Sequence, residues 1–244
     1  MCNLVIDIGN TNSKLAVFDH QNMVHYQRLK ELDETSLKGL IETYQIKNAT
    51  VSSVSKNVEE LGVFLGQLVN YIPFTTAINT GIKNNYQTQP TLGLDRWAKV
   101  IAAHGLYTGA NCLMIDAGTC ITYDVLTANS EYFGGSISLG VNMRFKALNH
   151  YTDRLPLVTW DKEEGIPEGT NTNNAIKSGV LNGVVNEVEG FIAAENKKNK
   201  DLKVIITGGD ADFLSKQLKN SIFAPQIIKE PYLVLKGLNE VFIR

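Results

Sequence analysis

Short runs of apolar residues, separated by turns rich in glycine and asparagine, open the chain. Residues 4–8 and 14–18 are two such runs on either side of the turn at 9–12, which predicts a β-hairpin. The same pattern in the rest of the first half predicts strands at 24–29 and 49–54, and helices at 36–44, 58–69 and 94–106.

Helices and strands alternate along the second half of the chain. Two buried strands are expected at 111–116 and 121–126, joined by a turn at 117–119. Further along, the pattern predicts helices at 141–148, 173–196 and 232–242, a strand at 204–207, and another helix after 208–210. Hairpins followed by alternating helices and strands are typical of an α/β fold.

A sequence repeat relates the two halves of the chain. Residues 4–11 resemble residues 113–120, because each is an apolar strand that ends in Asp-x-Gly and is followed by a threonine. The repeat predicts two similar halves, residues 1–110 and residues 111–244. We expect a cleft between two such halves, which is a favoured position for a ligand.

The composition narrows the class of protein. With 244 residues, 43 % of them hydrophobic and 20 % charged, the chain suits one or two globular domains. Its net charge of −2 argues against a dedicated surface for nucleic acid or anionic membranes. No run approaches the roughly 20 apolar residues of a membrane span, and we find no signal peptide. The three cysteines form no CxxC pair, so we expect reduced thiols and a cytoplasmic protein.

The two Asp-x-Gly turns are the first candidates for chemistry. Glycine lets the backbone approach a ligand closely, and the N–H groups of such turns can face an anion. An aspartate in the same turn implies a cation between its carboxylate and a phosphate, usually Mg²⁺. Plain β-turns use the same residue types, but the repetition on two buried strands favours phosphate binding. Walker, Rossmann and zinc-protease motifs are absent from the sequence.

The segment Gly93-Leu94-Asp95-Arg96 lies where a polar loop meets the predicted helix at 94–106. Two interpretations are open. Asp95 and Arg96 could form no more than a helix cap and a surface ion pair. Alternatively, Asp95 is a general base and Arg96 is a cation that binds a carboxylate or a phosphate.

Five segments together resemble one known family, type III pantothenate kinase. They are Asp7-Ile8-Gly9-Asn10-Thr11, Gly93-Leu94-Asp95-Arg96, Asp116-Ala117-Gly118-Thr119, Gly134-Gly135-x-Ile137 and Thr172-x-x-Ala175-Ile176-x-Ser178-Gly179. Their order and spacing are similar to those of the family, and they span nearly the whole chain. One departure is Leu139, which stands before Gly140 where the family commonly has proline.

The resemblance implies a fold, an activity and an assembly. The implied fold is α/β, with two ribonuclease-H-like halves of the actin, sugar-kinase and Hsp70-like (ASKHA) superfamily and a cleft between them. The implied activity is phosphorylation of the 4′-hydroxyl of pantothenate by ATP, the first step of coenzyme A biosynthesis. Mg²⁺ and a monovalent cation, K⁺ or NH₄⁺, are the implied cofactors, and the implied assembly is a homodimer.

On the acceptor side, the resemblance implies one catalytic residue and a set of substrate contacts. Asp95 would be the general base that takes the proton of the attacking hydroxyl. The implied contacts to pantothenate are Tyr86, Gly93, Leu94, Arg96 and Thr172. Arg96 would bind the carboxylate of pantothenate, and Thr172 would reach across the dimer.

On the donor side, the resemblance implies that the first hairpin turn holds the phosphates of ATP. The residues of this turn are Asp7, Ile8, Gly9, Asn10, Thr11, Asn12, Ser13 and Lys14. Asp7 would lie close to Mg²⁺, Asp116 would hold the monovalent cation, and Thr119 would contact a phosphate. Gly208-Gly209-Asp210 stands where the superfamily places a further turn on the nucleotide side.

Two other functions stay open. The first is a related kinase that acts on another small molecule. Arg96 favours an acid as that substrate, because a neutral sugar does not require a cation. The second is a non-catalytic accessory or regulatory factor, because some relatives of this family were first named as accessory factors for transcription. The intact Asp7, Asp95 and Asp116 argue against a protein without activity.

Overall fold

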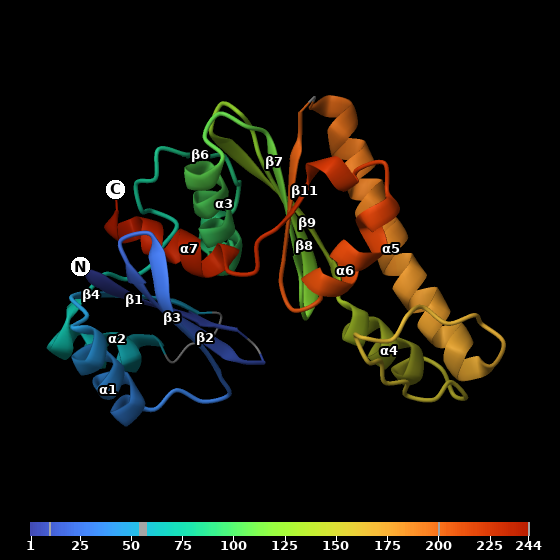
Figure 1. The fold of residues 1–244 in the computed structure, drawn as a ribbon, viewed down its shortest axis with the longest axis horizontal. Helices are drawn as coiled ribbons and strands as arrows, with labels where there is room; N and C mark the ends of the chain where they lie inside the picture. The colour runs from blue at the N-terminus through green and yellow to red at the C-terminus, as the bar shows by residue number, and fades with distance from the viewer. Residues whose placement is uncertain (10, 54–57, 200, 244) are drawn as a thin grey trace. The chain divides into compact units, whose positions relative to one another are not determined.

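The computed structural model describes residues 1–9, 11–53, 58–199 and 201–243 (Figure 1). They form two compact units. Unit 1 consists of Met1–Gly109, Asn129–Phe133 and Tyr232–Arg244, and unit 2 of Ala110–Ala128 and Gly134–Pro231. Compared with the halves expected from the sequence, two segments of the second half, 129–133 and 232–244, belong to unit 1.

Unit 1 contains a five-stranded sheet with the strand order β3-β2-β1-β4-β5. The strands are β1 (Cys2–Ile8), β2 (Ser13–Asp19), β3 (Asn22–Leu29), β4 (Asn48–Ser53) and β5 (Asn70–Tyr71). β1, β2 and β3 pair antiparallel, and β4 runs parallel to both β1 and β5. The expected hairpin and third strand are confirmed. Val54, the last residue of the expected fourth strand, lies outside the described residues.

Helices cover both faces of the sheet of unit 1 (Figure 1). They are α1 (Glu34–Tyr44), α2 (Val58–Leu68), α3 (Leu94–Leu106) and α7 (Leu233–Asn239). Successive side chains of a strand point to opposite faces. Leu4 and Ile6 of β1 therefore pack with Leu37 of α1 and Leu65 of α2 in one core. The other face of β1 lies against α7, so β1 is buried on both sides.

A row of asparagine amides fastens α7 to this sheet. Asn70 donates a hydrogen bond to Asn48 at 3.0 Å, and Asn48 donates to Asn3 at 2.9 Å. Asn3 donates in turn to the buried side chain of Asn239 at 3.0 Å. The amide of Asn239 donates to the carbonyl oxygen of His20 at 2.7 Å. Because their polar groups are satisfied in this way, Asn3 and Asn239 can be buried between β1 and α7.

The second sheet has the strand order β11-β10-β7-β8-β9-β6. Its strands are β6 (Lys83–Asn84), β7 (Cys112–Ala117), β8 (Cys120–Leu126), β9 (Glu131–Leu139), β10 (Lys203–Thr207) and β11 (Ile227–Lys229). β7 and β8 form the expected second hairpin, β10 pairs in parallel with β7, and β11 pairs in parallel with β10. β6 pairs only with the first two residues of β9, Glu131 and Tyr132, which belong to unit 1.

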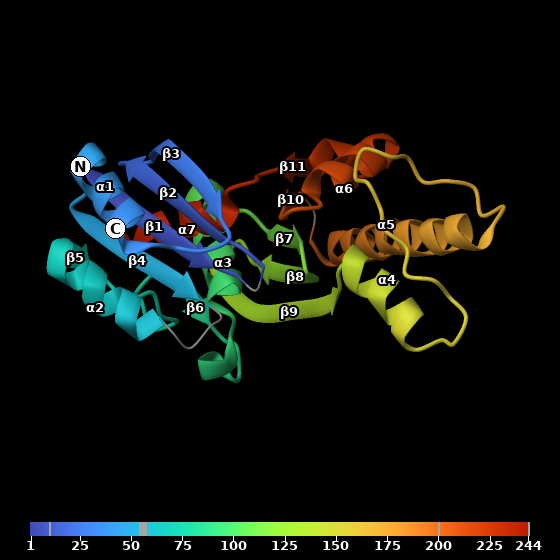
Figure 2. The same cartoon turned by 90° about the horizontal axis from the view of Figure 1, so that it is seen from below.

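The helices of unit 2 are α4 (Val141–His150), α5 (Thr172–Lys198) and α6 (Ala211–Gln217). α4 packs on the long helix α5 (Figures 1 and 2). Apolar side chains of β7, β8 and β10 form one core with these three helices. Short 3₁₀ turns complete the chain at Gln89–Thr91, Leu218–Asn220, Ala224–Gln226 and Glu240–Phe242. The last of these replaces the end of the helix expected at 232–242.

Strand β9 is the main element that the hydrophobic pattern did not predict. Its segment contains Gly134 and Gly135, which weaken strand propensity. The structure explains the second glycine, since a Cβ at Gly135 would overlap the carbonyl oxygen of Tyr123. Here glycine allows two backbones to approach closely within unit 2.

Candidate active site

The first Asp-x-Gly turn lies at the end of β1 in unit 1. Asp7 is 9 % exposed and pairs across the hairpin with Lys14, so the carboxylate and the ammonium group share one face of the sheet. Ile8 pairs with Ser13, and the Gly9 amide donates to the carbonyl oxygen of Asn12 at 3.2 Å. Thr11 is exposed at the tip. Asn10, one of the expected phosphate contacts, lies outside the described residues.

The start of α3 gives Asp95 and Arg96 their surroundings. The N-cap residue is Gly93, and Asp95 lies partly buried in the first turn. A methyl group at Gly93 would lie 2.6 Å from Oδ1 of Asp95, so glycine leaves the room that this carboxylate occupies. Arg96 is only 4 % exposed. The simpler interpretation, an Asp95 cap with a surface ion pair, is therefore wrong on both points.

In unit 1 the Arg96 guanidinium lies against the ring of Tyr86, which belongs to a cluster of three aromatic side chains. The central carbon of the guanidinium lies 5.6 Å from the centre of the Tyr86 ring, which is a cation–π distance. Tyr86 stacks on Tyr132 with ring centres 6.3 Å apart, and Trp97 packs against Tyr132 at 5.9 Å. Tyr86 and Arg96, 10 positions apart in the printed sequence, thus lie side by side. Leu94, the remaining residue of the motif, is partly buried beside Asp95.

The second Asp-x-Gly turn, at the end of β7 in unit 2, is held by glycine contacts. The Gly140 amide donates to the carbonyl oxygen of Thr119 at 3.1 Å. A Cβ at Gly140 would overlap the carbonyl oxygens of Gly118 and Thr119. Asp116 is partly buried, and the side chain of Thr119 is exposed at the tip of the turn.

The turn 208–210 packs on the same aspartate turn. Gly208 has a φ of +95°, which an L side chain rarely adopts, and a Cβ there would reach 2.5 Å from Oδ1 of Asp116. The Asp210 amide donates to the carbonyl oxygen of Ala117 at 2.9 Å. Lys162, from the loop before α5, pairs with the Asp210 carboxylate and donates to the carbonyl oxygen of Gly209 at 2.6 Å.

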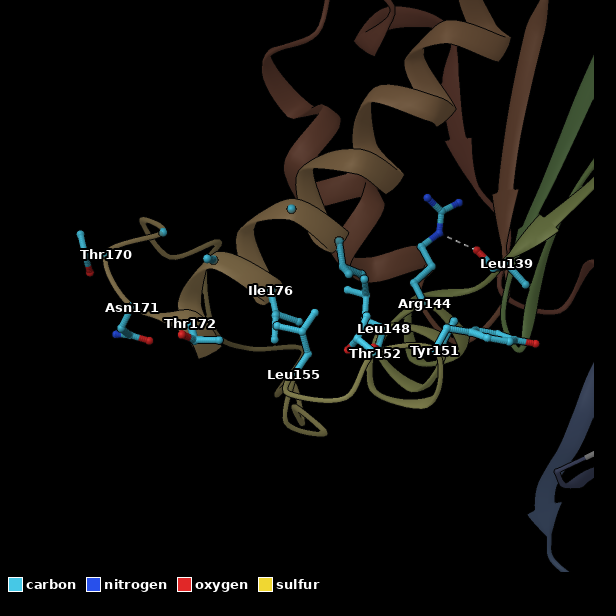
Figure 3. A pocket seen from close by; sticks show the side chains of 15 residues that line it. Leu139, Arg144, Leu148, Tyr151, Thr152, Leu155, Thr170, Asn171, Thr172 and Ile176 are labelled. Atoms are coloured by element: carbon cyan, nitrogen blue, oxygen red, sulfur yellow. Dashed lines mark hydrogen bonds between the residues drawn. The ribbon is translucent and has the colours of Figure 1, made fainter.

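In unit 2, Thr172 lies at the start of α5, where it lines an apolar groove of about 990 Å³ (Figure 3). Asn171 caps this helix by accepting a hydrogen bond from the Asn174 amide at 3.0 Å. The groove continues along Ile176 and Leu148 to Tyr151, which is 82 % exposed.

A polar cluster beside the groove was not foreseen from the sequence. Arg144 of α4 donates to the carboxylate of Glu187 on α5 at 2.5 Å. Glu187 also accepts a hydrogen bond from the hydroxyl of Tyr123 at 2.8 Å. Burial, and after it the hydrogen bond to Glu187, raise the pKa of Tyr123, so its hydroxyl stays protonated and donates.

Two kinds of feature are absent from the residues that the structure describes. No three His, Cys, Asp or Glu side chains among them gather into a group that could hold a metal ion. A cation at Asp7 or Asp116 would therefore need further ligands, such as phosphate oxygens and water. Within the same residues, no helix is long and apolar enough to cross a membrane.

The fold is similar to that of solved structures that include a sugar kinase. A ROK family glucokinase from Streptomyces griseus matches with a TM-score of 0.57 at 11 % identity, covering 99 % of each chain. A Baf family protein from Campylobacter jejuni matches with a TM-score of 0.62 at 22 % identity, covering 98 % of this chain and 96 % of that one. At these identities the likeness shows the fold alone.

Sequence comparison defines the family. The family model of type III pantothenate kinase matches residues 3–194. A type III pantothenate kinase of Phocaeicola vulgatus is 41 % identical over 98 % of this chain and 97 % of its own length. Another, from Bacteroides fragilis, is 42 % identical over 98 % and 96 %. The chain belongs to the type III pantothenate kinase family, and the resemblance based on its motifs is confirmed.

Proposed function

We propose that the chain uses ATP to phosphorylate the 4′-hydroxyl of pantothenate, the first step of coenzyme A biosynthesis. Membership of this kinase family supports the substrate. The observation that carries the proposal is the start of α3, where the Asp95 carboxylate lies over Gly93, next to the buried Arg96. A base and a buried cation at one helix start suit an acceptor that has both a hydroxyl and a carboxylate.

In the proposed reaction the acceptor oxygen attacks the γ-phosphorus of ATP. The new bond joins that oxygen to phosphorus, and the bond from the γ-phosphorus to the β,γ-bridging oxygen breaks. The hydroxyl proton passes to Asp95, and the products are 4′-phosphopantothenate and ADP. Such transfer depends mainly on positioning and on neutralising charge.

Arg96 and its aromatic neighbours would orient the acceptor. The guanidinium provides charge and paired N–H donors for the pantothenate carboxylate. Tyr86 covers the guanidinium and is itself held by stacking on Tyr132. We expect Gly93 and Leu94 to contact pantothenate through their backbone, and Thr172 to contact it from a second subunit.

The two aspartate turns would hold ATP and its cations. We expect the turn from Asp7 to Lys14 to bind the phosphates, with Asp7 near Mg²⁺. In unit 2 we expect Thr119 to contact phosphate and Asp116 to hold K⁺ or NH₄⁺. Partly buried carboxylates beside backbone carbonyls offer the oxygen donors that such cations prefer. When bound, the cations neutralise the charge on the transferred phosphoryl group.

The groove of unit 2 supports a homodimer, with a second copy of the chain as its occupant. Its lining is largely apolar and includes Tyr151, which is 82 % exposed, and Leu157, two positions after the lining residue Leu155, is 56 % exposed. Large exposed apolar surfaces of this kind mark interaction sites. The free cysteines are consistent with our placing the reaction in the cytoplasm.

Phosphorylation of pantothenate by the purified protein, with ATP and Mg²⁺ and with either K⁺ or Na⁺, tests the proposal. We expect 4′-phosphopantothenate, formed faster in K⁺. If a folded protein gives no product, the proposal fails and a regulatory role gains weight. Equal rates in both salts would contradict a monovalent cation site at Asp116, but they would not contradict the proposed reaction.

A further inference from the structure

The Leu139–Gly140 peptide connects Arg144 to the second aspartate turn. The carbonyl oxygen of this peptide accepts a hydrogen bond from Nε of Arg144 at 2.9 Å (Figure 3). Its N–H group donates to the carbonyl oxygen of Thr119 at 3.1 Å. Because a peptide unit is planar and rigid, fixing the carbonyl also fixes the direction of the N–H group.

Glu187 fixes the guanidinium of Arg144 in turn. The same Arg144 donates from Nη2 to Glu187 at 2.5 Å and to the Ser138 hydroxyl at 3.1 Å. Glu187 also accepts from the hydroxyls of Tyr123 and Ser138, at 2.8 and 3.1 Å. Both charged side chains are mostly buried, with 20 % and 24 % of their surfaces exposed. Charge-assisted bonds of this kind hold a planar guanidinium in one orientation.

The turn that this peptide contacts has little freedom to adapt. Gly140 packs so closely on Gly118 and Thr119 that a Cβ would overlap their carbonyl oxygens. A displacement of the Leu139–Gly140 peptide is therefore transmitted directly to the Thr119 backbone. All these contacts lie within unit 2.

We propose that Arg144, oriented by Glu187, is a positioning residue that aligns the Gly118–Thr119 turn for nucleotide phosphate. This inference rests on the proposed function, in which Thr119 contacts ATP. It differs from a role in the apolar groove that Arg144 also lines. A groove role would affect subunit association and pantothenate, whereas a positioning role affects the nucleotide.

The test uses Arg144→Met and the double variant Arg144→Met/Glu187→Gln. The single variant leaves the Glu187 charge unpaired and could fail to fold for that reason. The double variant removes this charge as well, and its new side-chain amide can still accept a hydrogen bond from Tyr123. Lys146→Met, an exposed cation on the same helix, is the matched control. For each protein we would measure KM for ATP and for pantothenate, nucleotide Kd by calorimetry, and oligomeric state by light scattering.

We expect KM for ATP and the nucleotide Kd to rise roughly tenfold in both Arg144 variants, the size typical of losing a charged hydrogen bond. KM for pantothenate and the oligomeric state should stay as in the wild type, and Lys146→Met should match the wild type throughout. Three results would overturn the inference: unchanged nucleotide binding, equal rises in both KM values with loss of the dimer, or a double variant that does not fold.

The calorimetry separates this inference from the proposed function. If the wild type binds nucleotide but does not phosphorylate pantothenate, the proposed reaction fails, while the comparison of Kd values still decides the role of Arg144. If the wild type binds no nucleotide, both fail.

Discussion

Replacing Gly140 by alanine tests how closely the second aspartate turn must be placed. The new methyl group would lie 2.8 Å from the carbonyl carbon of Thr119 and nearer still to two carbonyl oxygens. Carbon atoms in contact normally lie about 3.5 Å apart or more. The obstacle is backbone that cannot rotate away, so the turn must move by roughly 1 Å. A misplacement of that size can lower catalytic rates by about 100-fold.

The measurement is steady-state kinetics of ATP-dependent pantothenate phosphorylation, together with urea unfolding. We expect kcat/KM for ATP to fall about 100-fold and the free energy of unfolding to fall by about 1–3 kcal/mol, as for other overpacked sites. Gly190→Ala is the matched control, because nothing lies within 4 Å of a Cβ at this position of α5. It should keep full activity and gain about 0.5–1 kcal/mol of stability. Full activity in Gly140→Ala would refute the argument that the turn is fixed by this contact.

Three further predictions concern the base, the groove and a buried thiol. Asp95→Asn should lower kcat by about 100- to 10,000-fold with unchanged thermal unfolding, and near-normal turnover would remove Asp95 as the base. Tyr151→Glu should convert a dimer to monomer in light scattering, while Ile222→Glu, equally exposed at 86 %, should not; a dimer in both would place the interface elsewhere. Burial raises the pKa of Cys112 to about 11, so in the folded protein it should resist iodoacetamide at pH 8 while Cys2 and Cys120 react, as mass spectrometry can check. The unfolded chain loses the Cys112 proton at a lower pH than the folded protein does. The free energy of unfolding should therefore fall as the pH rises from about 9 to about 11.

The sequence predicted the elements whose signals are local. Apolar runs and helical spacing located β1, β2, α3 and α5 to within a few residues, because each buries a continuous face. The Asp-x-Gly repeat located both aspartate turns, because each turn is encoded by a few consecutive residues. Strand β9 was not predicted because Gly134 and Gly135 weaken its strand propensity, and only the folded structure shows that Gly135 allows close contact with Tyr123 of β8.

The rest depends on contacts between distant parts of the chain. The bond between Arg144 and Glu187 joins side chains 43 positions apart, and neither carries a motif. The room for the Asp95 carboxylate comes from the absent side chain of Gly93, which only the folded structure reveals. The membership of 232–244 in unit 1 is likewise a property of tertiary packing.

That last feature has a consequence for synthesis on the ribosome. The strands of unit 1 precede unit 2 in the chain, whereas α7, the helix that covers one face of them, follows unit 2. Until Asn239 emerges, Asn3 and the His20 carbonyl lack their partner, and that face of β1 is open. All residues of unit 2 precede α7 in the chain, so unit 2 can fold ahead of unit 1, against the usual order from the N-terminus. A chain that stalls before α7 would thus leave this face of β1 exposed, and unit 1 is complete only once α7 has been made.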